Sequence, residues 1–242
     1  MADMQVRRSA QRPATESDGI VSRHSFSFGP YYDPGNLGFG ALLACNEDVI
    51  APGAGYPPHP HRETEIVTWV LSGILRHRDD HGGQGIVEAG MVQRLSAGSG
   101  VEHSELSIAE AGELHLVQMW VRPDEVGGPP DYAVVDVSSS LSGGQLTPIV
   151  SGLPQHRGVA PLTLRQAGAG LSAARLGAGM GIALPAAALA HLLVTAGSVE
   201  IEADGVAESI GPGDAVRIIG ADGEAVRAAG DAEILVWELA EQ

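Results

Sequence analysis

The sequence contains no lysine, because all fourteen of its basic residues are arginines. Schiff-base and pyridoxal chemistry both require a lysine amine, so the sequence excludes these reaction classes. There is a single cysteine, Cys45, which excludes an intrachain disulfide and agrees with a reducing compartment. Because Cys45 lies in the apolar run GALLAC, we expect it to be a small buried side chain rather than a nucleophile.

Long apolar runs and excess positive charge are also absent. No segment reaches the ~18 continuous apolar residues that a membrane-spanning helix needs. The first residues carry arginines but no apolar stretch of the kind found in a secretory signal. The formal net charge of −16 repels phosphate backbones and anionic membrane surfaces. We therefore expect a cytoplasmic protein that binds neither nucleic acid directly nor a membrane.

Glycine and proline, in contrast, are abundant. The 33 glycines and 15 prolines divide the 242 residues into short apolar runs, which is typical of an all-β fold. The second half repeats the first in outline, because residues 69–82 align with residues 192–205. We predict two similar β domains, residues 1–140 and 141–242, with a segment rich in proline, glycine and serine between them.

Two pairs of polar residues in the first half are spaced for metal binding. Residues i and i+2 of a β-strand point to the same face, roughly 6.6 Å apart. Each pair can therefore direct two ligands toward one ion, and two neighbouring strands can complete the shell. Three imidazoles and a carboxylate suit Fe(II), Mn(II), Ni(II), Cu(II) or Zn(II) without selecting among them. We predict one divalent metal, held by His59, His61, His103 and Glu105.

The other histidines stand alone in the sequence, and we expect structural or solvated roles for His24, His77, His81, His115, His156 and His191. In the second half, the repeat alignment places Ala183, Pro185, Val226 and Ala228 on or near the four ligand positions. None of these side chains can bind a metal. The second domain is therefore expected to lack a metal site.

The segments around the predicted ligands resemble the two motifs of the cupin superfamily and, more specifically, the pirin family. The resemblance is carried by YYDPGNLGFGALLACNEDVI at 31–50, HPHRETEIVTWVLSG at 59–73, LSAGSGVEHSE at 95–105 and LHLVQMWV at 114–121. It implies two tandem cupin barrels, also called double-stranded β-helices, of which the N-terminal one binds metal and the C-terminal one is degenerate. Pirins imply iron, so we expect Fe(II), while Mn, Ni, Cu and Zn stay open.

The same resemblance leaves one ligand ambiguous. In many cupins the carboxylate ligand is the glutamate of the first motif, here Glu65. Pirins instead use the position of Glu105, which also shares a strand face with His103. We therefore favour Glu105 and expect Glu65 to support the site or to bond the backbone.

Two functions follow from the resemblance. Some pirins cleave flavonols such as quercetin with O2, in which case Glu105 would ligate the metal and take the proton of the flavonol 3-hydroxyl. Others are non-enzymatic metal-binding proteins that act as regulatory partners of a transcription factor or a metabolic enzyme. Aromatic residues near the N-terminus would either hold a flat substrate or belong to the core, namely Phe26, Phe28, Phe39, Tyr31, Tyr32 and Tyr56. Pirins are often monomeric, and we expect a monomer.

Overall fold

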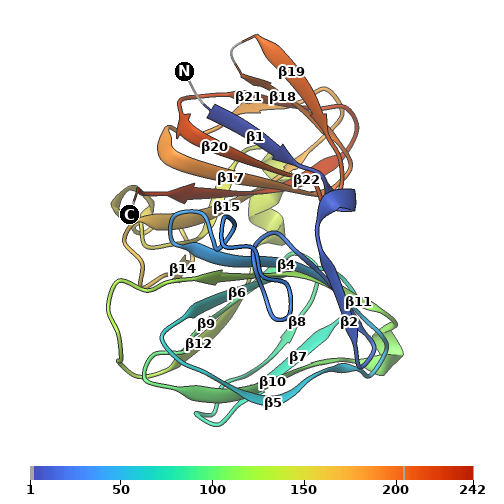
Figure 1. Cartoon of the computed structure of the whole chain (residues 1–242), viewed down its shortest axis with the longest axis vertical. Helices are drawn as coiled ribbons and strands as arrows, with labels where there is room; N and C mark the ends of the chain where they lie inside the picture. The colour runs from blue at the N-terminus through green and yellow to red at the C-terminus, as the bar shows by residue number, and fades with distance from the viewer. Residues whose placement is uncertain (1–2, 204, 242) are drawn as a thin grey trace.

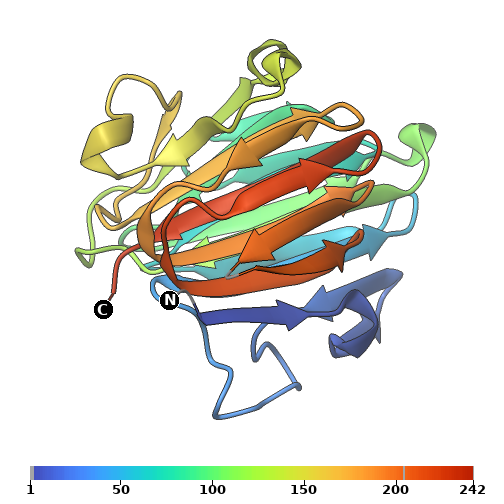
Figure 2. The same ribbon diagram turned by 90° about the horizontal axis from the view of Figure 1, so that it is seen from above.

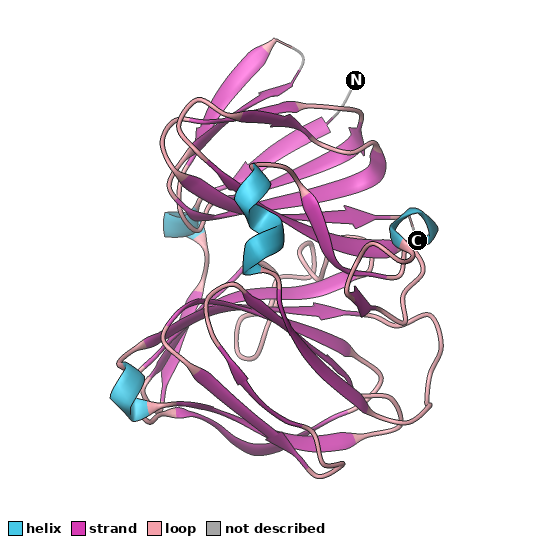
Figure 3. Ribbon diagram, turned by 180° about the vertical axis from the view of Figure 1, so that it is seen from behind, coloured by secondary structure: helices cyan, strands magenta, loops and turns pink. Residues whose placement is uncertain are grey.

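The computed structural model describes residues 3–203 and 205–241, and almost all of their regular structure is β. The strands form two barrels stacked along the long axis of the molecule (Figure 1). The helical elements are short 3-10 turns (Figure 3): η1 (Ser9–Gln11), η2 (Ala109–Ala111), η3 (Ser138–Gly143) and η4 (Pro154–His156). The fold is thus the predicted all-β arrangement of two tandem cupin barrels.

The first barrel consists of a seven-stranded and a four-stranded sheet. The larger sheet has the order β12 (Asp131–Asp136), β9 (Met91–Ser96), β6 (Glu65–Ser72), β11 (Leu114–Val121), β4 (Leu42–Ile50), β3 (Ile20–His24) and β2 (Ala14–Ser17). The smaller sheet has the order β5 (Gly55–His61), β10 (Val101–Ser107), β7 (Leu75–Asp79) and β8 (Gln84–Val87).

The second barrel repeats this strand order. Its larger sheet runs β1 (Asp3–Arg7), β20 (Ala215–Ala221), β17 (Ala187–Ala196), β22 (Ala232–Leu239), β15 (Ala169–Leu176), β13 (Thr147–Ser151) and β14 (Leu162–Thr163). Its smaller sheet runs β16 (Gly181–Ala183), β21 (Ala225–Ala228), β18 (Val199–Ala203) and β19 (Val206–Ile210). In this topology β21 takes the place of β10, and β16 takes the place of β5.

The N-terminal strand β1 does not lie in the barrel to which the predicted division at residue 140 assigns it. β1 pairs antiparallel with β20, with Asp3 opposite Ile219, whereas β2 pairs with β3 in the first barrel. The chain therefore begins in the second barrel and crosses to the first through η1 (Figure 1). Near residue 140, η3 lies between β12 of the first barrel and β13 of the second. The two domain limits themselves stay a prediction.

The two seven-stranded sheets pack face to face and share one apolar core (Figure 2). Strands such as β6 and β22 are apolar on both faces, because one face lines a barrel and the other meets the opposite sheet. Trp69 and Trp237 contribute the largest side chains of this shared core. Cys45 is buried there as expected, and burial raises the pKa of its thiol, which disfavours the nucleophilic thiolate.

The barrel interiors differ. The interior of the second barrel is filled by a single aliphatic cluster that includes Val226 and Ala228. The first barrel instead contains two separate aliphatic clusters, one around Leu116 and the other around Leu95. Polar side chains of β6, β9 and β11 occupy the layer between them. This polar layer makes the first barrel the place where a site can form.

Within the residues described, no helix has the length and hydrophobicity needed to cross a bilayer.

Candidate metal centre

The pairing of β5 with β10 in the first barrel brings three of the predicted ligands together. β5 carries His59 and His61, and β10 pairs antiparallel with it so that His103 lies opposite His59. The ring centroids are 4.8 Å apart for His59 and His61, 4.5 Å for His59 and His103, and 4.9 Å for His61 and His103. One ring nitrogen from each residue lies within 4.8 Å of the other two. The i,i+2 spacing on one strand and the pairing with a second strand therefore produce a cluster of three imidazoles.

The protonation of these imidazoles suits a metal ion. Burial, together with the neighbouring His59, lowers the pKa of His61 to about 4. Burial also lowers the pKa of His103 to about 4, although Glu105 opposes the shift. Both rings are therefore neutral near pH 7, which is the form that binds metal.

The histidines of the cluster have ring nitrogens that can bind a metal ion. His59 Nδ1 donates to the Pro57 carbonyl oxygen at 2.8 Å, so its Nε2 carries a lone pair. His103 Nε2 is buried and has no hydrogen-bond partner among the described residues. A buried nitrogen with a free lone pair is stabilised by a coordinated cation. The three histidines therefore fit a divalent metal.

Glu105 lies next to the histidine cluster, and two glutamine side chains hold its carboxylate. Its carboxylate groups with His77 and His103 rather than with His59 and His61. One carboxylate oxygen accepts a hydrogen bond from Gln93 Nε2 and the other from Gln118 Nε2, each at 2.7 Å. The assignment of Glu105 as a fourth ligand stays a prediction.

Glu105 is ionised at neutral pH. Burial alone would raise its pKa. The neighbouring imidazoles of His77 and His103 and the hydrogen bond from Gln93 outweigh burial and lower the pKa to about 2. The site therefore contains a fixed negative charge beside the three imidazoles.

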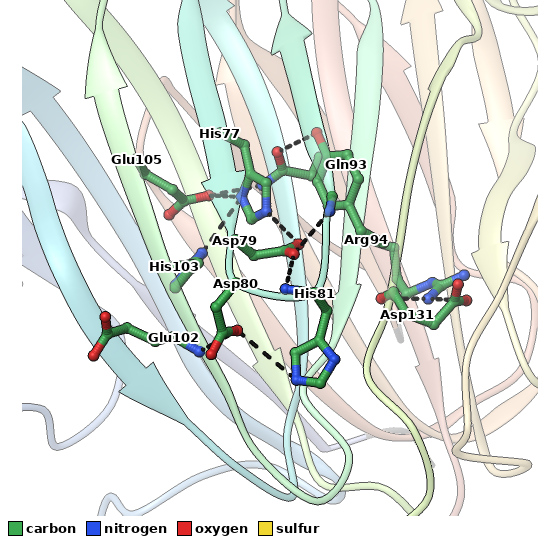
Figure 4. A network of polar contacts seen from close by, with 12 residues as sticks. His77, Asp79, Asp80, His81, Gln93, Arg94, Glu102, His103, Glu105 and Asp131 are labelled. Atoms are coloured by element: carbon green, nitrogen blue, oxygen red, sulfur yellow. Dashed lines mark hydrogen bonds and ion pairs between the residues drawn. The ribbon is translucent and has the colours of Figure 1, made fainter.

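His77 is a site residue that the sequence reasoning missed. It is fully buried on β7, and its Nδ1 lies 3.4 Å from His103 Nδ1 (Figure 4). His77 Nε2 lies 3.2 Å from Asp79 Oδ2, so the carboxylate accepts a hydrogen bond from the Nε2–H group. With the Nε2 proton directed at Asp79, His77 Nδ1 is placed to accept from His103 Nδ1–H, which leaves the lone pair of His103 on the nitrogen inside the cluster. The sequence does contain a signal for His77, because His77 and Asp79 have the same i,i+2 spacing as the predicted ligand pairs.

Glu65 belongs to neither histidine group. Its Oε2 accepts a hydrogen bond from Ser96 Oγ at 2.8 Å and one from the Arg165 backbone N–H at 3.2 Å. Most of the remaining histidines also have partners outside the cluster: Asn46 for His24, Asp80 for His81, Glu47 for His115 and Ser151 for His156. His191 is buried between the barrels.

A cavity of about 560 Å³ lies beside β5 and is lined by Phe28, Tyr56 and Pro57. Trp120 links this region to the cluster, since its ring centroid is 4.9 Å from that of His61 and 5.0 Å from that of Phe28. Phe26 has no solvent exposure and belongs to the shared core. Among the N-terminal aromatic residues, Phe28 and Tyr56 thus reach the cavity, and Phe26 does not.

Comparisons with known proteins agree with this fold. A sequence model of the Pirin family matches residues 4–121. A protein of Mycobacterium tuberculosis (strain H37Rv), provisionally named a quercetin 2,3-dioxygenase, is 42% identical over 238 residues, which are 98% of this chain and 96% of the relative. The quercetin 2,3-dioxygenase of Escherichia coli K12 is 42% identical over 127 residues, 52% of this chain and 55% of that protein.

The structural comparison covers the whole molecule. The bacterial pirin YhhW of Escherichia coli, in complex with nickel(II), superposes with a TM-score of 0.88 at 33% identity, covering 99% of this chain and 100% of that one. The two stacked barrels and the histidine cluster in the first define a bicupin with one polar centre. The chain belongs to the pirin family.

Proposed function

We propose that this pirin is a metal-dependent dioxygenase that cleaves flavonols such as quercetin with O2. The observation that supports this most directly is the convergence of His59, His61 and His103, with Trp120 in contact with both His61 and the cavity residue Phe28. Relatives that carry the quercetin 2,3-dioxygenase name, one of which aligns along nearly the whole chain, support the same substrate class.

His59, His61 and His103 would hold the metal, with Glu105 as the fourth ligand. We expect Fe(II), and the nickel(II) complex of the Escherichia coli pirin keeps Ni(II) among the alternatives. A bound divalent ion supplies Lewis acidity that lowers the pKa of a coordinating hydroxyl and brings substrate and O2 to one centre.

The residues of the chain then orient the substrate and move one proton. The cavity has a volume within the range of small-molecule sites, and Phe28 and Tyr56 offer ring faces to a flat polyphenol. Glu105, ionised at neutral pH, accepts the proton of the flavonol 3-hydroxyl on one of its two oxygens. That step replaces a hydrogen bond from Gln93 or Gln118.

The test is O2 uptake with quercetin by protein loaded in turn with Fe(II), Mn(II), Ni(II), Cu(II) and Zn(II). We expect O2 consumption to accompany loss of the flavonol absorbance and release of carbon monoxide. His103→Ala should abolish all three signals together with metal content, whereas Glu105→Gln should retain more metal and lose turnover. The proposal fails if no metal gives turnover above the free ion with a panel of flavonols, or if His103→Ala stays active.

A non-enzymatic regulatory role is the alternative, and it predicts a large apolar docking surface. The exposed large apolar side chains of the described residues, such as Leu37, Ile86 and Met180, are scattered over both barrels. If no metal-loaded form turns over a flavonol in the experiment above, the regulatory role becomes the function to test.

A further inference from the structure

A group of cationic side chains lies at the junction of the two barrels, where β1 and η1 connect them. Arg7, Arg8 and Arg12 line a small cavity of about 70 Å³, and Tyr31 and Asn36 line it from the segment that follows β3. The volume is about that of two water molecules at ~30 Å³ each in the liquid. We call this cavity the junction pocket.

Two of its arginines are neutralised by carboxylates. Arg8 forms ion pairs with Glu208 at 2.9 Å and with Asp214 at 3.0 Å. Arg12 pairs with Glu47 at 2.9 Å. Arg7 differs, because its side chain has neither an ion pair nor a hydrogen bond with any residue that the structure describes, and its Nε atom is buried.

A second uncompensated charge lies behind the wall of the pocket. Arg217 on β20 is 7% exposed, and its guanidinium donates to the Ser25 carbonyl oxygen at 2.9 Å and to Asn36 Oδ1 at 2.8 Å. Its Cζ lies 4.3 Å from the Phe26 ring centroid. These acceptors are neutral, and Nε has no partner in the described part of the chain. Burial and the nearby Arg7 lower the pKa of Arg217 to about 10, so it remains charged at neutral pH.

The chain carries 30 acidic residues against 14 basic ones, yet no carboxylate of the described residues forms an ion pair with Arg7 or with Arg217. Two guanidinium groups that repel each other near a barrel junction are destabilising unless an anion lies between or beside them. Arginine side chains with free N–H groups are the usual partners of phosphate and sulfate oxygens.

We propose that the junction pocket binds a small tetrahedral oxyanion, phosphate or sulfate. Arg7 would supply the direct ion pair, and Tyr31 and Asn36 would supply hydrogen bonds from the opposite wall. Arg217 would hold Asn36 in place and add positive potential. The small volume suits the free ion, because the base or sugar of a larger phosphate ester would have to extend out of the cavity. Because its walls come from β1, η1 and the segment after β3, the bound ion would stabilise the junction of the barrels.

The test uses the full-length protein freed of phosphate and sulfate by dialysis. Binding of each ion is measured by isothermal titration calorimetry and by thermal unfolding, with sodium chloride used to keep ionic strength constant. We expect one saturable site per chain and a midpoint temperature that rises with phosphate or sulfate concentration.

Arg7→Gln should weaken phosphate binding at least tenfold, because it removes the lining arginine whose side chain has no partner among the described residues. Arg157→Gln is the matched control, since it removes an exposed arginine of the second barrel and should leave the affinity unchanged. Metal content should be the same in both variants, which separates this site from the histidine cluster. AMP should bind at least tenfold more weakly than phosphate.

Several results would overturn the proposal. Chloride could raise the midpoint temperature as much as phosphate does at equal ionic strength, which would indicate a general salt effect and an adventitious ion only. An equal loss of phosphate affinity in Arg7→Gln and Arg157→Gln would indicate nonspecific attraction of the anion to positive charge. Acetate binding as tightly as phosphate, or AMP binding more tightly, would rule out a site for a small tetrahedral ion.

Discussion

At the scale of single residues, metal binding at the proposed site depends on which nitrogen of each imidazole carries the proton. Asp79 fixes the proton of His77 on Nε2, and His77 in turn fixes that of His103 on Nδ1. The partners of the imidazoles thus direct lone pairs into the cluster without contacting its centre.

Asp79→Asn tests this arrangement. Asp79 Oδ1 accepts the backbone N–H groups of His81 and Gly83, and an asparagine oxygen can keep both bonds. The asparagine Nδ2 would then donate to His77 and reverse the proton positions, so that His103 presents an N–H to the cluster. We expect metal affinity to fall by about 10–100-fold with little loss of stability. Competition with a chelator measures the affinity, and exposed Asp80→Asn is the control. Equal affinities for the two variants would contradict the arrangement.

His191 gives a pH-dependent prediction for the second barrel. It is 1% exposed, neither ring nitrogen has a partner among described residues, and burial beside Arg217 lowers its pKa to about 3. Its unfolded pKa is about 6.5. Between pH 6.5 and pH 3 the unfolded state therefore binds the extra proton, and the free energy of unfolding falls as pH falls.

The free energy of unfolding of His191→Leu should therefore depend less on pH than that of the parent. We expect the difference to reach about 1.4 kcal/mol for each pH unit between pH 6.5 and pH 3. Urea unfolding of variant and parent at pH 7, 6 and 5 measures the difference. A difference in free energy that stays constant from pH 7 to pH 5 would show that His191 does not titrate in this way.

At the scale of elements, the pairing of β5 with β10 positions the cluster. Gly55 begins β5 with φ of +148°, and an added Cβ would overlap the Glu105 carbonyl oxygen and come within 2.7 Å of Leu106 Cα. The register shift of this strand pair falls between His103 and Glu105. A side chain at position 55 would therefore push the strand that carries both residues.

Gly55→Ala should lower the free energy of unfolding by about 1–3 kcal/mol, because the backbone contact and the unusual φ both resist a side chain. Metal content should fall as well, since β10 is displaced. Gly230→Ala is the control, because a Cβ there meets no heavy atom within 4 Å. Chemical unfolding and metal quantification measure both effects. A Gly55→Ala protein as stable as Gly230→Ala, with full metal content, would show that the close approach is not required.

At the scale of the whole molecule, the shared core joins the two barrels into one folding unit. Trp69 of β6 has no solvent exposure and donates its indole N–H to Glu233 Oε1 of the second barrel at 2.8 Å. Trp237 of β22 donates to Met119 Sδ of the first barrel at 3.2 Å. Each barrel therefore covers apolar surface that the other would expose alone.

Trp69→Ala should lower the free energy of unfolding by about 3–5 kcal/mol, and both barrels should still unfold in one transition. Differential scanning calorimetry tests whether the calorimetric and van't Hoff enthalpies agree. Ile86→Ala, at an exposed position on β8, should change the free energy by less than about 0.5 kcal/mol. Two separate transitions, with only the first shifted by Trp69→Ala, would contradict a shared folding unit.

The amino-acid sequence by itself determined the all-β repeat and the spacing of the histidine pairs. Glycine and proline end strands locally, and alternation along a strand places His59 and His61 on one face whatever surrounds them. These features depend on neighbours in the chain, so the all-β repeat could be predicted from the residues. The two cupin barrels that the resemblance to pirins implies are confirmed.

Only the tertiary structure decided which distant residues meet. The pairing of β1 with β20, the contact of His77 with His103 and the proximity of Arg7 to Arg217 join segments far apart in the chain. No local pattern encodes such contacts, because they follow from the way the sheets close and stack. For the same reason the sequence placed Glu105 with the histidines by spacing, while the packed barrel decided that Gln93 and Gln118 hold its carboxylate.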